Sequence, residues 1–254
     1  MSHRHTAFIL LLIALPGLRL CAQVPDSVMV RVRAMMEERA YASAFERLQE
    51  ADPYNKDLEA ALLRTAIVLD GYTQSISHQL FGLKDLLPGD DLDAIRASGG
   101  QYNMVLYPAN EKLGLLLHEH PDHLGLHRAL ADFIFDANMN YGDDWLMTTD
   151  SVMALVEEHY GFANTHGGGD AESWYRQGFA ALALDHADRA APALAKAVAL
   201  EPGNARWQYN LAYAYMGIDE RTKSIAAARA AYALDADGTD RGDAARLVAI
   251  MYQE

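Results

Sequence analysis

Residues 171–204 read AESWYRQGFAALALDHADRAAPALAKAVALEPGN, and residues 205–238 read ARWQYNLAYAYMGIDERTKSIAAARAAYALDADG. The two stretches have equal length, and offsetting the chain by 34 positions brings identical residues together. The matching pairs are Ala171 with Ala205, Tyr175 with Tyr209, Ala180 with Ala214, Ala193 with Ala227, Ala197 with Ala231, Ala199 with Ala233 and Leu200 with Leu234. A fixed period of this size indicates one supersecondary unit that is used twice.

The pattern inside each unit predicts two helices. Apolar or small residues recur three and four positions apart, and polar or glycine-containing stretches at 185–188 and 217–220 interrupt them. Small residues such as Gly178 and Ala190 let two helices approach closely, while Leu194, Leu211 and Tyr215 fill the space between them. Pro202 and Gly203 are expected to end the second helix of the first unit.

These residues resemble the tetratricopeptide repeat (TPR) signature. The first unit carries it at Trp174, Gly178, Ala190, Leu194, Ala197 and Pro202, and the second at Leu211, Ala212, Tyr215, Ala228 and Ala231. Gln177, Ser224 and Ala236 depart from the signature. The resemblance covers 171–237 and implies an all-α fold, a TPR-like right-handed superhelix of antiparallel helix pairs.

The remaining chain is also predicted to be helical, although less regular. We interpret 23–163 as an irregular helical region with degenerate TPR-like units, because two units alone bury too little apolar surface. An unrelated helical domain is the alternative. A non-helical connection is expected over 88–108, with a strand-like run at Tyr102–Tyr107, and a glycine-rich linker at 164–170. Residues 238–254 are predicted to form a capping helix that covers the last pair.

The first 22 residues predict a secretory signal. Arg4 precedes an apolar run from Ala7 to Leu15, and a small residue, Ala22, precedes the expected cut. The resulting Ala-Gln junction resembles the signals of Bacteroidetes-type bacteria. Cys21 is the only cysteine, and Leu20 before it is unlike the small residue that a lipidation site needs. We therefore expect an exported protein, periplasmic or secreted, without a lipid anchor and without membrane insertion after signal removal.

The net charge of the chain argues against two classes of partner. Its formal charge of −14 becomes −16 without residues 1–22, because that segment holds two arginines and no acidic residue. Such an acidic chain repels nucleic acids and anionic membranes, so neither is expected as a partner.

The TPR resemblance implies a protein or peptide partner held in the concave groove that the first helices line. Helical spacing places seven side chains there, namely Tyr175, Arg176, Phe179, Arg206, Tyr209, Asn210 and Tyr213. Aromatic and arginine side chains are the types that dominate binding energy at interfaces. No nucleophile or phosphate-loop motif occurs in the sequence, so the chain is predicted to be a non-enzymatic scaffold of the bacterial cell envelope, without a cofactor. Permanent packing into an envelope assembly is a further option.

A histidine cluster supports the alternative of a metal-binding protein or metal-dependent enzyme. His118, His120, His123 and His127 lie within ten residues, and imidazole is a common zinc ligand. Against this reading, Pro121 is expected to separate two helices, so the cluster is equally well interpreted as a polar turn. The run from Asp136 to Asp144 resembles a calcium loop, but Met147 stands where the closing carboxylate should be.

Overall fold

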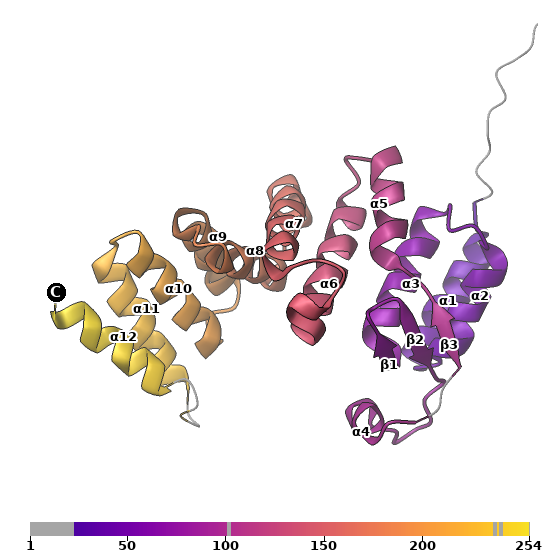
Figure 1. Cartoon of the computed structure of the whole chain (residues 1–254), viewed down its shortest axis with the longest axis horizontal. Coiled ribbons are helices and arrows are strands. Elements are labelled where there is room, and N and C mark those ends of the chain that lie inside the picture. Colours follow the sequence, from indigo (N-terminus) through magenta and orange to yellow (C-terminus); the bar gives the residue numbers. More distant parts are fainter. Residues whose placement is uncertain (1–22, 101–102, 236–237, 239–240, 254) are drawn as a thin grey trace, which may run out of the picture.

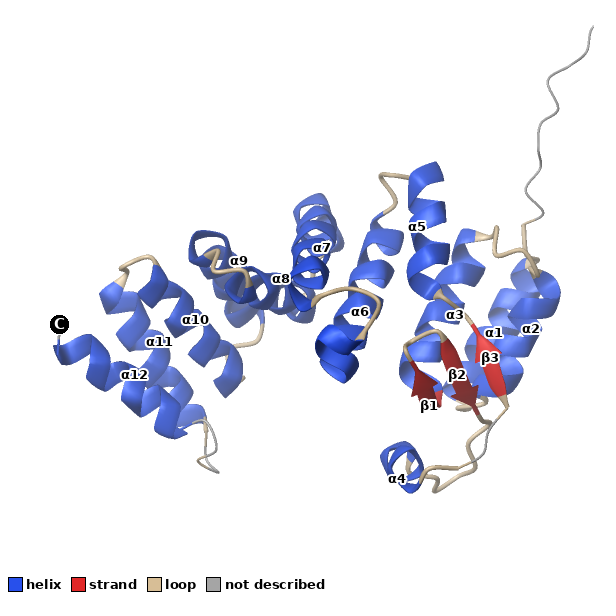
Figure 2. Ribbon diagram, in the orientation of Figure 1, coloured by secondary structure: helices blue, strands red, loops and turns tan. Residues whose placement is uncertain are grey.

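The computed structural model describes residues 23–100, 103–235, 238 and 241–253. The predicted signal segment lies outside these residues. The described chain forms an elongated row of helices, with α12 at one end and a small sheet near the other (Figures 1 and 2). The helices are α1 (Asp26–Glu37), α2 (Tyr41–Ala51), α3 (Leu58–Gly71), α4 (Leu92–Ser98), α5 (Ala109–Glu119), α6 (Leu124–Tyr141), α7 (Thr149–Ala163), α8 (Ala171–Ala183), α9 (Ala187–Leu200), α10 (Ala205–Gly217), α11 (Arg221–Leu234) and α12 (Arg241–Gln253). The strands are β1 (Tyr72–Ile76), β2 (Leu80–Leu83) and β3 (Met104–Leu106).

The predicted all-α, TPR-like architecture is confirmed. Each helix packs on its successor from α5 to α12, so pairs stack on pairs rather than around one centre. In the regular units the pairs are α8 with α9 and α10 with α11. Asp170 begins α8 with a reciprocal cap, because its side chain accepts from the Ser173 N–H while the Ser173 hydroxyl accepts from the Asp170 N–H.

Close approach within the first regular pair depends on Gly178. A Cβ atom at this position would lie 2.6 Å from Cγ of Leu194, closer than any van der Waals contact allows. Leu194 is completely buried, as are Ala180 and Ala190. Burying one leucine side chain stabilises the fold by about 2 kcal/mol, so the missing side chain of Gly178 makes room for a sizeable apolar contribution.

The second regular pair accommodates a polar residue where the TPR signature has alanine. Ser224 of α11 is fully buried, and its hydroxyl donates to the Ala212 carbonyl of α10 at 2.8 Å. The hydrogen bond offsets the cost of burying the hydroxyl, which explains why this departure is tolerated. On the other side of α11, α12 packs with Leu247 and Met251 buried.

The N-terminal helices pack around a buried arginine. Arg64 of α3 is completely buried and donates through Nη2 to the carbonyls of Leu48 and Asp52, each at 2.6 Å. It also pairs with the Asp52 carboxylate at 3.3 Å. These carbonyls belong to the last turn of α2 and the residue after it, and each also accepts a backbone N–H, from Asp52 and from Asn55 respectively. The guanidinium therefore adds to the hydrogen bonds at the end of α2 while it joins α2 to α3.

A small sheet is inserted between α3 and α5. Its strand order is β1-β2-β3 with antiparallel neighbours, and β3 is therefore an edge strand. The strand-like run predicted at 102–107 contains β3, with Tyr102 outside the described residues. The β1–β2 hairpin and α4 were missed. α4 corrects the expectation of a wholly non-helical 88–108 connection. The hairpin was missed because Ser77 and His78 both adopt positive φ in its turn without the Asn-Gly or Asp-Gly signal that usually marks such a turn.

The hairpin is fixed to α6 by a buried histidine. His78 has no exposed surface, and its Nε2 lies 2.6 Å from the Asp136 carboxylate of α6. Its Nδ1 lies 2.9 Å from Oγ of Ser75, which also accepts from the Tyr141 hydroxyl. The imidazole is enclosed by aromatic rings, those of Tyr72, Phe81, Phe133 and Tyr141.

The segment between α7 and α8 is packed. Residues Asn164–Gly168 continue α7 as a π-type turn, and Gly167 adopts φ of 92°. Asn164 is buried, donates to the Gln177 side chain at 2.9 Å and accepts from Ser173 Oγ at 2.7 Å. Helices α7 and α8 pack directly on each other across this segment. The domain boundary that we place at 164–170 stays a prediction. None of the described helices is both long and apolar enough to cross a membrane.

We expect Gly178→Val to destabilise the protein by about 2 kcal/mol, because the added side chain overlaps Leu194 in a closely packed interface. Urea unfolding followed by tryptophan fluorescence, to which Trp174 and Trp207 of the regular units contribute together with Trp145, measures the effect. Gly203→Val is the matched control, since nothing lies within 4 Å of a Cβ atom at that position. Equal stability of the two variants would contradict the packing account.

Candidate functional site

The seven predicted partner-binding residues lie on the first helices of the two regular pairs. Helix α8 carries Tyr175, Arg176 and Phe179, and α10 carries the other four, Arg206, Tyr209, Asn210 and Tyr213. Together with Asp132 and Phe135 of the preceding first helix, α6, they form a surface that we call the first-helix face. Binding of a partner at this surface stays a prediction.

Aromatic rings connect the three helices of the first-helix face. Phe135 and Phe179 lie edge to face, with centroids 5.9 Å apart, and Phe179 lies 6.1 Å from Tyr175. Tyr175 in turn stacks on Trp207 of α10 at 4.9 Å with an interplanar angle of 14°. The Asn210 side chain donates to the Tyr175 hydroxyl at 3.1 Å. Part of the predicted set therefore serves contacts between the pairs as well as facing outward.

Phe135 and Trp207 were not among the residues predicted for this surface. Trp207 is buried, with 5% of its surface exposed, and supplies the plane on which Tyr175 rests. Its position three residues after the N-cap Asn204 is a signal of a packed first turn, but spacing alone does not show that Tyr175 lies above it. Phe135 lies outside the two regular units, so the 34-residue offset does not match it with an equivalent residue.

An ionic network ties α6, α7 and α8 together beside these rings. Arg176 contacts Asp132 at 3.1 Å, Glu172 at 2.7 Å and the Tyr160 hydroxyl at 3.3 Å. The Tyr160 hydroxyl also donates to Asp132. The same guanidinium lies 5.0 Å from the ring centroid of Phe135, a cation–π contact.

Burial and neighbouring charges shift the pKa values of Tyr160 and Arg176 in this network. Burial raises the pKa of Tyr160, and the negative charge of Asp132 raises it further, so the phenol stays protonated and donates. The pKa of Arg176 is also raised, because its acidic and phenolic neighbours outweigh the effect of burial. Arg176 is therefore a permanently charged residue that already has partners within the protein.

The accessible part of the first-helix face lies toward α10. Tyr213 keeps 48% of its surface exposed, and Arg206 is exposed as well. Tyr175, Arg176, Phe179, Tyr209 and Asn210 are half-buried. A ligand that reaches the face would meet Tyr213 and Arg206 directly, and would contact the edges of the half-buried rings.

The surface continues from α6 to α3. A cavity of 160 Å³ lies between these two helices, with Leu62 and Leu69 on one side and Arg128 and Asp132 on the other. Arg128 contacts Asp170 at 2.6 Å and Asp132 at 3.7 Å. The acidic groups at this end of the surface are therefore already paired within the protein.

The four histidines of the alternative site do not converge. His118 is in the last turn of α5, His120 follows that helix, and both are exposed. His123 is the N-cap of α6, with Nδ1 accepting from the Leu126 N–H at 3.2 Å. His127 stacks on Phe162, and its ring nitrogens lie 2.9 Å from His159 Nδ1 and 2.8 Å from the Pro121 carbonyl.

In the part of the chain that the structure describes, side chains that could bind a metal ion are not gathered at one point. No group of three or more histidine, cysteine, aspartate or glutamate side chains is placed to hold an ion there. In the segment that resembles a calcium loop, Asn138 donates to Thr149 Oγ at 2.9 Å and Asp143 accepts from the Thr149 N–H at 2.6 Å. These side chains hold the start of α7 and do not converge on a common point.

Ser75, His78 and Asp136 form a chain of hydrogen bonds that no sequence motif indicates. The residues resemble a catalytic triad by type. However, the serine is on Nδ1 and the carboxylate on Nε2, and the fully buried imidazole is surrounded by aromatic rings. The arrangement gives both ring nitrogens of His78 a partner, and we interpret it as the anchor of the hairpin.

Comparison with solved structures identifies the fold. No protein-family model and no curated protein matches the chain. A structure of MamA from AMB-1 matches 83% of this chain and 95% of its own length, with a TM-score of 0.54 and 15% identity. MamA from RS-1 matches 85% and 98%, with a TM-score of 0.53 and 12% identity. At these identities the likeness concerns the fold alone.

A further structure, YrrB, is described as a TPR protein with an unusual peptide-binding site. It matches 57% of this chain, which spans 66% of the length of YrrB, with a TM-score of 0.46 and 14% identity. The two MamA matches show that the chain has the stacked helix-pair fold of TPR-like proteins.

We expect Arg176→Met to lower the free energy of unfolding by about 1–3 kcal/mol, because it removes the cation that contacts both the half-buried Asp132 carboxylate and the Tyr160 hydroxyl. Thermal and urea unfolding measure this loss. Arg246→Met is the control, since its exposed ion pair with Asp243 contributes less than about 1 kcal/mol. A loss no larger than that of the control would contradict the role of the network.

Proposed function

We propose that the protein is a non-enzymatic scaffold that binds a protein or peptide partner along the first-helix face, in the groove on the concave side of the helix row. The observation that carries the proposal is the continuous run of aromatic and arginine side chains across α6, α8 and α10, which ends in the exposed Tyr213 and Arg206. Such side chains supply large contact areas at small entropic cost, and they dominate known binding hot spots.

The half-buried residues support this role through rigidity. Tyr175 is held by stacking on Trp207 and by the hydrogen bond from Asn210, and Arg176 is held by three partners. A surface that is already ordered loses little conformational freedom when a ligand binds. The contacts that stack the helix pairs would therefore also prepare the binding surface.

Charge indicates where one end of a ligand would lie on the face. The α10 end presents the exposed Arg206, whereas Asp132 at the α6 end already contacts Arg176 and Arg128. We infer a partner segment with an acidic or carboxylate group near α10. Such a contact would fix the position of one end of the segment.

Site-specific photo-crosslinking tests the surface. With a benzophenone amino acid replacing Tyr213, we expect a discrete covalent product in the native cell extract. The same amino acid replacing Tyr232 of α11 is the matched control, because Tyr232 has a comparable exposed fraction of 40% but belongs to a second helix. Addition of Arg206→Ala should reduce the yield at position 213. Products at position 232 alone, or equal products at both, would place the partner elsewhere.

We also propose that the protein acts in the cell envelope after export, on the strength of the signal-like segment 1–22. Mass spectrometry of the protein purified from its native source should find Gln23 at the N-terminus. Fractionation should recover it outside the cytoplasm, with a cytoplasmic marker protein as the control. A chain that retains Met1 and fractionates with the cytoplasm would refute export while leaving the binding face untouched.

A further inference from the structure

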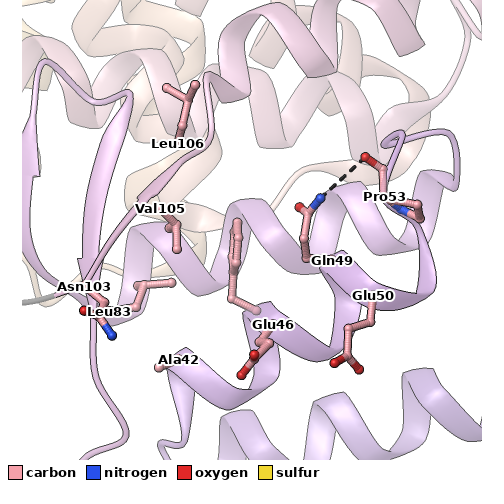
Figure 3. Close-up of a pocket in the computed structure, with 10 residues that line it drawn as sticks. Ala42, Glu46, Gln49, Glu50, Pro53, Leu83, Asn103, Val105 and Leu106 are labelled. Carbon is pink, nitrogen blue, oxygen red and sulfur yellow. Dashed lines mark hydrogen bonds between the residues drawn. The ribbon is translucent and has the colours of Figure 1, made fainter.

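A cavity of 760 Å³ lies between α2 and the edge of the sheet (Figure 3). Glu46, Gln49 and Glu50 of α2 line one side, and Leu83, Val105 and Leu106 of the strands line the other. Its volume falls within the range of about 300–1,000 Å³ that is typical of ligand sites. The cavity is separate from the first-helix face, and no sequence motif indicates it.

The cavity follows the free edge of β3. Consecutive side chains of a strand point to opposite faces of the sheet, yet both Val105 and Leu106 line the cavity. A space that touches both faces of one strand runs along its edge. The strand order β1-β2-β3 leaves this edge without a neighbouring strand among the described residues.

The hydrogen-bond pattern shows which backbone groups face the open edge. The Tyr107 N–H donates to the Gln79 carbonyl at 2.7 Å, so residues 107 and 79 form a hydrogen-bonded pair. Such pairs alternate in an antiparallel ladder, which makes Val105 with Phe81 the next one. Met104 and Leu106 lie between them, and their N–H and C=O groups therefore point away from β2 toward the open edge.

The side chains around the cavity combine an apolar wall with an acidic rim. Phe45 and Leu83 are buried, with 4% and 6% of their surfaces exposed, whereas Glu46 and Glu50 are exposed. Glu50 has an ion pair with Arg47 at 3.4 Å between exposed side chains, which holds it only weakly. No basic residue is among the described residues that line the cavity.

We propose that this cavity binds an extended peptide of a partner protein, which pairs with β3 as an additional strand. Its backbone would bond to the outward N–H and C=O groups of Met104 and Leu106, in the manner of strand addition. One apolar side chain would enter the space beside Phe45, Leu83 and Val105. A lysine or arginine next to it would meet Glu46 and Glu50.

Charge favours this occupant over a second copy of the chain. Pairing β3 with β3 of another copy would bring two acidic rims together on molecules that each carry a formal charge of −14. Like charges opposed at an interface cost free energy, whereas a basic peptide is attracted. The proposal is independent of the first-helix face, since the two surfaces share no residue.

Selection from a displayed library of short random peptides against the full chain tests the proposal. We expect enrichment of peptides with an apolar residue beside lysine or arginine. Leu106→Pro removes one outward N–H without touching the β2–β3 bonds, and should weaken the enriched peptides by about tenfold. Leu106→Ala keeps that N–H and is the matched control. Tyr213→Ala should leave this binding unchanged.

Glu46→Gln combined with Glu50→Gln should abolish the preference for basic residues. If circular dichroism shows that Leu106→Pro does not fold, this double variant is the deciding test of the proposal. The proposal is overturned by an absence of enrichment, by enriched peptides without basic residues, or by equal binding to Leu106→Pro and Leu106→Ala. A wild-type dimer that Leu106→Pro converts to a monomer in sedimentation would also overturn it in favour of pairing between copies.

Discussion

The close contact between helices of a pair is the constraint on which the structure depends. Gly178 lies so near Leu194 that a single added carbon would overlap it, and the buried alanines at 190, 212 and 228 pack in the same apolar cluster as Leu194. Small residues at these points leave each pair with apolar sides that only a neighbouring pair can cover. Stacking follows from that need, and α12 ends the row by covering α11 with Leu247 and Met251.

The same stacking produces the surfaces that we assign to binding. First helices meet through Phe135, Phe179, Tyr175 and the buried Trp207, and the first three of these rings remain partly accessible. At the other end of the molecule, the sheet inserted between α3 and α5 adds a free strand edge beside α2 (Figure 2). A stack of helix pairs has no such edge of its own, so the insertion gives this chain a second kind of surface.

The sequence predicted the regular helix pairs because their small and apolar residues repeat at a fixed offset. It did not predict the β1–β2 hairpin, since the left-handed turn at Ser77 and His78 lacks glycine and asparagine, and the buried His78 is stabilised by Asp136, which is distant in the sequence. The stacking of Tyr175 on Trp207 and the tie from Arg176 to Asp132 and Tyr160 also arise only when separate helices meet. Helical spacing identified which residues share a face, but not which of them contact one another.

The central claim is that the packing of helix pairs leaves the first helices receptive to a partner. Hydrogen–deuterium exchange of the protein, alone and with the partner captured through position 213, tests it most directly. The account predicts added protection in α8 and α10 and in the adjoining part of α6, with α9 and α11 unchanged. Added protection confined to the second helices, or spread evenly over both helices of each pair, would contradict it.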